Sequence, residues 1–202
     1  KQKNTWVGSQ SNNEEKIFPE LNKKLKETAF LGYNKTKTES KLLHIILNGE
    51  IVNYVEKKQS DIILIFDRTP FYAEAGGQVG DSGNFYTQEN DLIGRIIDTK
   101  KMDNDIYLHY LTNNTTELKV NETYILSVNT ERREKIRNNH SATHLLHASL
   151  RNILGDHISQ KGSLVNDEKL RFDFTFNDQL TTDQVNKIES LVNQTIRANI
   201  QS

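Results

Sequence analysis

Two histidines within one short run are the first residues whose types and spacing could do chemistry. The run is His140-Ser141-Ala142-Thr143-His144. Side chains four residues apart on an α-helix lie on one face, so both imidazoles could bind the same metal ion. A metallopeptidase is excluded, because its mechanism needs a glutamate directly after the first histidine and Ser141 stands there. For a pair of this spacing taken alone, a solvated polar helix face is the commoner explanation.

The helical stripe that carries this pair also bears on its role. At about 100° per residue, His147 and Arg151 continue the stripe of His140 and His144. This geometry argues against histidines buried in a core, because the stripe lies roughly opposite an apolar one. The members of the apolar stripe are Ala142, Leu146, Ser149 and Ile153.

A glycine-rich run from Asp67 to Gly83, DRTPFYAEAGGQVGDSG, could form a binding loop. Four glycines within eight residues let the backbone turn sharply and approach a ligand closely. It is not a Walker A loop, since no Lys-Ser/Thr pair follows the glycines. Taken alone, a cluster of β-turns is the simpler explanation. Its candidates for contact with a small polar group are Thr69, Glu74, Gly76, Gly77 and Gln78.

Two further groups are candidates for contact with substrate. In the run Gln160-Lys161-Gly162-Ser163, a strand edge with a glycine bulge is the simpler alternative to a binding role. The second group is a compact basic patch suited to phosphate contacts, although a solvated helix face explains it as well. Its members are Arg132, Arg133, Lys135 and Arg137.

The elements that must position these residues change type along the chain. Residues 17–28 have helical spacing and predict a connector helix. Short apolar runs at 42–47, 51–55, 62–66, 93–97, 106–111 and 124–128 predict strands, the first two joined by an Asn48-Gly49 hairpin turn. Many short strands with polar turns indicate a small barrel or sandwich.

After residue 130 the pattern returns to helices. We predict helix at Glu131 to Asn138 and at His140 to Leu154, ended by Gly155. Two strands are predicted next, at 157–165 and 170–176. A capping box from Thr181 to Gln184 then opens a last helix. The fold class predicted is α+β. We expect a linker with the connector helix at 1–39, a β-rich barrel or sandwich at 40–129 and a histidine-bearing α+β domain at 130–202.

Composition excludes several classes of protein. Charge is balanced, with 26 Lys+Arg against 27 Asp+Glu, so only a local basic patch could bind nucleic acid. The sequence has no cysteine, which rules out disulfides and thiolate ligands within it. No apolar run approaches the about 20 residues that span a bilayer. We expect a cytoplasmic protein without a membrane partner, and a piece of a longer chain.

Taken together, these motifs resemble one family. The stretch 139–174 resembles the editing domain of alanyl-tRNA synthetases, and Asp67 to Gly83 resembles the glycine motif of the same family. Phe30 to Tyr33 (FLGY) and Thr5 to Gln10 (TWVGSQ) are similar to the linker that follows its aminoacylation domain. The resemblance implies a β-barrel followed by an α+β editing domain.

The resemblance also implies a zinc site and a substrate. Zinc would be held by His140 and His144 with a later Cys-x-x-x-His pair, which this sequence lacks, so the expected Zn²⁺ site is incomplete here. The implied reaction is hydrolysis of the ester of tRNA(Ala) mischarged with serine or glycine, with Gln160 near the ester. Thr69 is our candidate for recognising the serine hydroxyl. A free-standing editing deacylase and a non-catalytic tRNA-binding or structural module remain alternatives.

Overall fold

The computed structural model describes residues 25, 27–102 and 104–198, and these divide into two compact units. The barrel unit holds the described residues up to Glu74 together with Gly80–Asn129, and the histidine-helix unit holds Ala75–Val79 together with those from Thr130 onward. The fold is α+β, as predicted. The connector helix predicted at 17–28 lies almost wholly outside the described residues. No helix within the described ranges is long and apolar enough to span a membrane.

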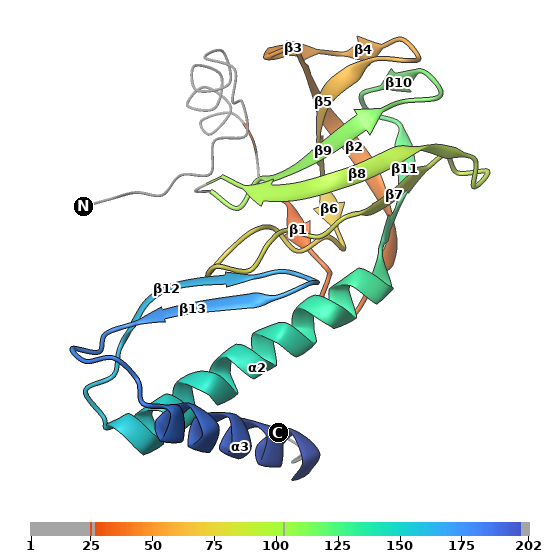
Figure 1. Cartoon of the computed structure of the whole chain (residues 1–202). Coiled ribbons are helices and arrows are strands. Elements are labelled where there is room, and N and C mark those ends of the chain that lie inside the picture. Colours follow the sequence, from red (N-terminus) through yellow and green to blue (C-terminus); the bar gives the residue numbers. More distant parts are fainter. Residues whose placement is uncertain (1–24, 26, 103, 199–202) are drawn as a thin grey trace. The chain divides into compact units, whose positions relative to one another are not determined.

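The barrel is a six-stranded sheet closed on itself (Figure 1). Its strands run in the order β11-β7-β8-β9-β5-β2, and β11 also pairs with β2, which closes the ring. Closure leaves no free edge among these six strands. Their bounds are β2 (Lys37–Leu47), β5 (Ser60–Phe66), β7 (Gly83–Tyr86), β8 (Leu92–Lys101), β9 (Tyr107–Asn113) and β11 (Thr123–Val128).

Short strands complete the barrel unit. Strand β3 (Glu50–Val52) extends the sheet beyond β2 through the predicted turn, where Asn48 and Gly49 both have positive φ, of 51° and 80°. That pair of conformations is the one a two-residue hairpin loop requires, so the predicted Asn-Gly hairpin is confirmed. The other pairs are β1 (Ala29–Phe30) with β6 (Arg68–Thr69) and β4 (Tyr54–Val55) with β10 (Leu118–Lys119).

Strand β5 is buried on both faces, which explains why its sequence is a continuous apolar run. Leu64 and Phe66 point into the main core of the barrel unit, whereas Ile63 and Ile65 join a second cluster with Ile106. Alternate side chains of a strand point to opposite faces, so each cluster takes every second residue. A strand buried on both faces can therefore contain five consecutive buried residues, as β5 does. A strand with one exposed face would instead alternate buried and exposed residues.

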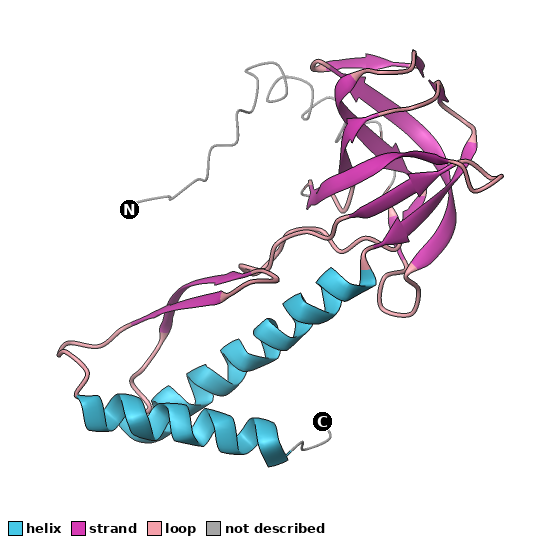
Figure 2. Ribbon diagram, turned by 45° about the vertical axis from the view of Figure 1, so that its right-hand side comes forward, coloured by secondary structure: helices cyan, strands magenta, loops and turns pink. Residues whose placement is uncertain are grey.

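The histidine-helix unit packs two helices and one hairpin around a small core. Helix α2 (Thr130–Leu154) is one continuous helix, and both α3 (Thr182–Ala198) and the hairpin β12 (Gln160–Val165) and β13 (Leu170–Phe174) contact it (Figure 2). The predicted capping box opens α3, since the Gln184 amide N–H donates to Thr181 Oγ1 and the Thr181 N–H donates to Gln184 Oε1. Core residues include Leu150, Ile158 and Ile188.

The structure differs from the sequence predictions at four places. Strand β2 begins at Lys37, inside the segment expected to be linker, and Ala75–Val79 belongs to the histidine-helix unit instead of the barrel. Strand β12 begins at Gln160, three residues later than predicted. Strand β7, which follows the glycine run, was not predicted at all.

Candidate functional site

The glycine pair of the candidate site forms a tight two-residue turn. Gly76 and Gly77 have φ of 59° and 85°, and Ala75 and Gln78 on either side exchange backbone hydrogen bonds of 3.1 and 3.0 Å. Two consecutive positive φ angles define the type I′ turn, which glycine adopts without strain. The two glycines therefore allow the chain to reverse direction sharply, directly before Gln78.

This turn is held against strand β12 by its backbone. The Val79 N–H donates to the Val165 carbonyl at 3.0 Å, and the Val165 N–H donates to the Gly77 carbonyl at 2.8 Å. A Cβ built on Gly77 would lie 2.5 Å from the carbonyl oxygen of Ser163, closer than real Cβ contacts come. Gly77 thus has two reasons to be glycine, its φ and this close approach.

The turn brings Gln78 to the histidine helix. Gln78 Oε1 lies 2.5 Å from His140 Nδ1, across 62 residues of sequence. One helical turn further along α2, the ring of His144 stacks on that of His140 with centroids 4.9 Å apart and planes inclined by 16°. The glycine run and the histidine pair therefore meet through Gln78 and His140.

The two histidines differ in their surroundings. His140 is half-buried and His144 is exposed. Burial lowers the pKa of His140 below its ordinary value, and the neighbouring His144 lowers it further. Both effects favour the neutral imidazole, which is the form that binds a metal ion.

His147 departs from the predicted polar stripe. Its ring lies 5.1 Å from that of Phe172 on β13, and its Nε2 is buried without a hydrogen-bond partner among the described residues. The predicted apolar face of α2 is confirmed in part, since Ser149 is buried and Leu146 and Ile153 pack against the core. The buried face also extends to Ile136, Thr143 and Leu150, whereas Ala142 is only half-buried. The hairpin covers this side of the helix, which helix periodicity alone does not reveal.

The residues present fit part of a zinc site. Stacked imidazoles one helical turn apart offer nitrogen donors of the kind that zinc takes. Among the described residues, no group of three or more His, Cys, Asp or Glu side chains is placed to hold one metal ion. Within the described residues, His140 and His144 could therefore offer two nitrogen donors to one metal ion.

Gln160, the predicted catalytic residue, lies at the other end of strand β12. An extra residue between Gln160 and Gly162, the glycine bulge weighed from sequence, sets Gln160 opposite Phe174. Directly opposed residues point to the same face, so Gln160 shares the side of the hairpin that carries Phe172 and Phe174 against the helical core. Val165 lies five positions further along the strand, at a distance of about 16 Å. The structure therefore does not bring Gln160 into the contact between Gln78 and His140.

Thr69, the candidate for serine recognition, is fully buried in the barrel unit. Its hydroxyl lies 2.7 Å from His109 Nε2 and accepts a hydrogen bond from the Phe71 N–H at 3.1 Å. His109 is also fully buried, and its Nδ1 lies 3.1 Å from the Leu64 carbonyl. The sequence carries no local signal for His109, because a single histidine within an apolar strand is not distinctive.

Acidic neighbours accompany the predicted basic patch. Arg132 pairs with Asp167 at 3.1 Å, Lys135 with Glu131 at 2.8 Å, and Arg137 with Glu134 at 2.9 Å. The last two pairs are exposed, and solvent-exposed ion pairs contribute little to stability. A phosphate could therefore replace the carboxylates at little cost. The fourth member, Arg133, is half-buried on the same helix.

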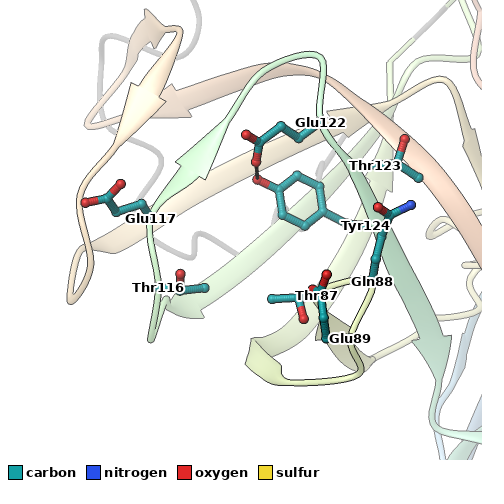
Figure 3. Close-up of a pocket in the computed structure, with 8 residues that line it drawn as sticks. All are labelled: Thr87, Gln88, Glu89, Thr116, Glu117, Glu122, Thr123 and Tyr124. Atoms are coloured by element: carbon teal, nitrogen blue, oxygen red, sulfur yellow. Dashed lines mark hydrogen bonds between the residues drawn. The ribbon is translucent and has the colours of Figure 1, made fainter.

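A hollow at the barrel surface lies apart from all these residues in sequence (Figure 3). It has a volume of about 450 Å³, and the Tyr124 hydroxyl donates to Glu122 Oε2 at 3.0 Å within it. Glu89 and Glu117 also line it, so its charge disfavours nucleic acid. None of the sequence-predicted site residues lines this hollow.

Comparison with known proteins gives the class to which the chain belongs. A sequence model of the family described as tRNA synthetases class II (A) matches residues 1–132. The chain therefore belongs to the class II (A) tRNA synthetases. Within that class it is similar to alanine–tRNA ligases, which agrees with the resemblance found in its motifs.

Three such ligases illustrate the similarity. The ligase of Wolbachia pipientis wMel is 41% identical over 196 residues, covering 96% of this chain and 22% of its own length. The ligase of Acidithiobacillus ferridurans is 41% identical over 186 residues, covering 92% of this chain and 21% of its own length. The ligase of Fusobacterium nucleatum subsp. nucleatum is 45% identical over 174 residues, covering 86% of this chain and 19% of its own length. The chain spans about a fifth of the length of these relatives.

Proposed function

We propose that this chain is the editing part of an alanine–tRNA ligase and that it hydrolyses the ester of tRNA(Ala) mischarged with serine or glycine. The parent enzyme would charge tRNA(Ala) with alanine. The observation that carries the proposal is the contact of Gln78 with His140, which joins the glycine turn to the two stacked histidines in one unit. A reactive site needs its donors and its substrate-facing loop together, and this contact supplies that proximity.

Editing is needed because the aminoacylation site of the parent enzyme can discriminate only weakly between similar amino acids. A pocket for alanine discriminates against one methylene-sized difference by only about 1–3 kcal/mol, so a second hydrolytic site is needed for serine and glycine. A zinc ion, when bound by His140 and His144, would polarise the attacking water or orient the ester. We assign Gln160 to positioning water or substrate, a role that requires the substrate to reach from the contact of Gln78 with His140 to the other end of β12. The backbone of Gly76 is open to close approach of the substrate, whereas Gly77 packs against Ser163.

Recognition of serine by Thr69 would require a local rearrangement. The Thr69 hydroxyl is engaged by His109 in the barrel unit, so it must leave that bond before it can contact a substrate. Thr69→Val keeps the shape and removes the hydroxyl. Discrimination between mischarged serine and glycine, measured with this variant, tests the role.

The proposed RNA contacts are the exposed cations of α2. Lys135 and Arg137 can exchange their carboxylate partners for phosphates without breaking a buried contact. Arg132 pairs with Asp167 in a less exposed setting, which ties the first turns of α2 to the end of the hairpin. Lys135 and Arg137 are therefore our preferred phosphate contacts.

Hydrolysis of mischarged tRNA tests the function directly. We expect a longer chain that includes the Cys-x-x-x-His motif to release serine from Ser-tRNA(Ala), and the double change His140→Ala/His144→Ala to slow release by at least about 100-fold, because the metal loses half its protein donors. The measurement is the rate of loss of labelled serine from the tRNA. A double variant as active as the unchanged chain would refute the assignment.

Zinc binding by this chain alone should be weak. A structural zinc site has an apparent binding free energy of about 10–16 kcal/mol, and two donors from this chain can provide only the smaller part of it. Isothermal titration with zinc, with His140→Ala/His144→Ala as the control, measures the affinity. A stoichiometric nanomolar site that the control abolishes would contradict this prediction.

A non-catalytic tRNA-binding module is the second candidate. It is favoured by the finding that, within the described part of the chain, no third His, Cys, Asp or Glu side chain joins His140 and His144 to hold a metal ion. In that case the chain would bind tRNA(Ala) but would not release serine from it. A free-standing deacylase is the third candidate, and it would release serine with this chain alone.

A further inference from the structure

The structure defines the chemical environment of one nitrogen of His140. Gln78 Oε1 lies 2.5 Å from Nδ1, within hydrogen-bond distance. An amide oxygen can only accept a hydrogen bond. The ring nitrogen must therefore carry the proton and donate it, which makes neutral His140 the Nδ1–H tautomer.

That tautomer decides which nitrogen is free for other chemistry. When Nδ1 carries the proton, the lone pair of a neutral imidazole resides on Nε2. A histidine that binds a metal through one nitrogen is usually oriented by a hydrogen bond from the other. Gln78 is placed to provide this orienting contact.

The backbone gives Gln78 a fixed starting point for this contact. The residues on both sides of Gln78 bond to Val165, and the type I′ turn reverses the chain directly before it. Gln78 itself is half-buried, so its side chain has restricted freedom. Preorganisation of this kind lowers the entropy lost when the side chain holds the imidazole.

We propose that Gln78 is a positioning residue that holds His140 as the Nδ1–H tautomer and reserves Nε2 as its donor nitrogen. This inference rests on the proposed function in taking His140 as a metal donor, but the tautomer itself is a property of the protein without metal. It reassigns Gln78 from direct substrate contact to support of a histidine. The glycine turn then acts on the histidine pair as well as on the substrate.

The test is the ring ¹⁵N spectrum of His140 in the metal-free chain, at a pH about 1.5 units above the ordinary histidine pKa of about 6.5 so that the ring is neutral. We expect the Nδ1–H tautomer to predominate in the unchanged chain. Gln78→Leu keeps the size of the side chain but removes the acceptor, and it should return His140 to a mixture of tautomers. Gln78→Glu keeps an oxygen at the same reach, and it should retain the Nδ1–H form.

Gln194→Leu is the matched control, since it makes the same change at an exposed position of α3 in the same unit. It should leave the His140 spectrum unchanged. A predominant Nε2–H form in the unchanged chain would overturn the proposal, because the amide nitrogen would then face the ring. An unaltered tautomer ratio in Gln78→Leu would overturn it too. Deacylation measured on the longer chain with zinc, carrying the same substitutions, bears on the proposed function alone, so the two can fail separately.

Discussion

Acidification from about pH 6.5 to about pH 4 is expected to lower the free energy of unfolding of the barrel unit by about 3 kcal/mol through His109 alone. Burial lowers the pKa of His109 to about 4, although hydrogen bonds to the backbone of Leu64 and Tyr107 act in the opposite direction. An unfolded chain returns this group to its ordinary pKa of about 6.5. Between these values the unfolded state binds a proton that the folded state refuses, so stability falls as the pH falls.

The hydrogen bonds around His109 explain why protonation is costly. The neutral ring donates from Nδ1 to the Leu64 carbonyl and accepts at Nε2 from the Thr69 hydroxyl, which in turn accepts from the Phe71 N–H. A second ring proton would face the Thr69 hydroxyl and displace its hydrogen. The charge would also be surrounded by the edges and faces of Phe66 and Phe71, which solvate it poorly.

Urea unfolding at several pH values measures this effect. NMR intensities of the β5 amides report on the barrel separately from the histidine-helix unit, which matters because two units need not unfold together. His109→Gln, although less stable at neutral pH, should show a flatter dependence on pH between about 6.5 and 4 because it cannot titrate. All other titratable groups are the same in the unchanged chain and in His109→Gln, so the difference between them reports on His109. Equal acid dependence of the two would show that His109 is not its source.

The parts of the fold that sequence could predict are those with local signals. The Asn48-Gly49 turn, the Thr181 capping box and the end of α2 at Gly155 each rest on a few neighbouring residues, and each is present. Strand β7 has no such signal, because Gly83 opens it and Phe85 is its only fully buried large side chain. Its identity depends on pairing with β8, the next strand along the chain, and with β11, which begins only at Thr123.

The candidate site shows the same division between local and tertiary information. Helical spacing placed His140 and His144 on one face, and the stacked rings agree. Spacing could not name Gln78 as the partner of His140, since that contact depends on the pairing of the glycine turn with Val165. It also misplaced His147, because the hairpin brings Phe172 over that ring.

Replacing Gly77 with alanine should disrupt the candidate site far more than the same change at Gly76. Both positions have positive φ, so alanine costs about 1–2 kcal/mol at each. A Cβ at Gly76 meets no atom within 4 Å, whereas a Cβ at Gly77 would lie 2.5 Å from the Ser163 carbonyl oxygen. Overlap with a backbone atom adds about 1–3 kcal/mol or displaces the turn.

Gly76→Ala is thus the matched control for Gly77→Ala, since it has the conformational cost without the overlap. We expect the histidine-helix unit of Gly77→Ala to lose about 1–3 kcal/mol more in urea unfolding than that of Gly76→Ala. If the turn moves away instead, the contact of Gln78 with His140 is lost, and the ring ¹⁵N spectrum of His140 should change in Gly77→Ala only. Equal stability of the two variants, with unchanged His140 spectra in both, would show that the close packing of Gly77 on Ser163 does not position Gln78.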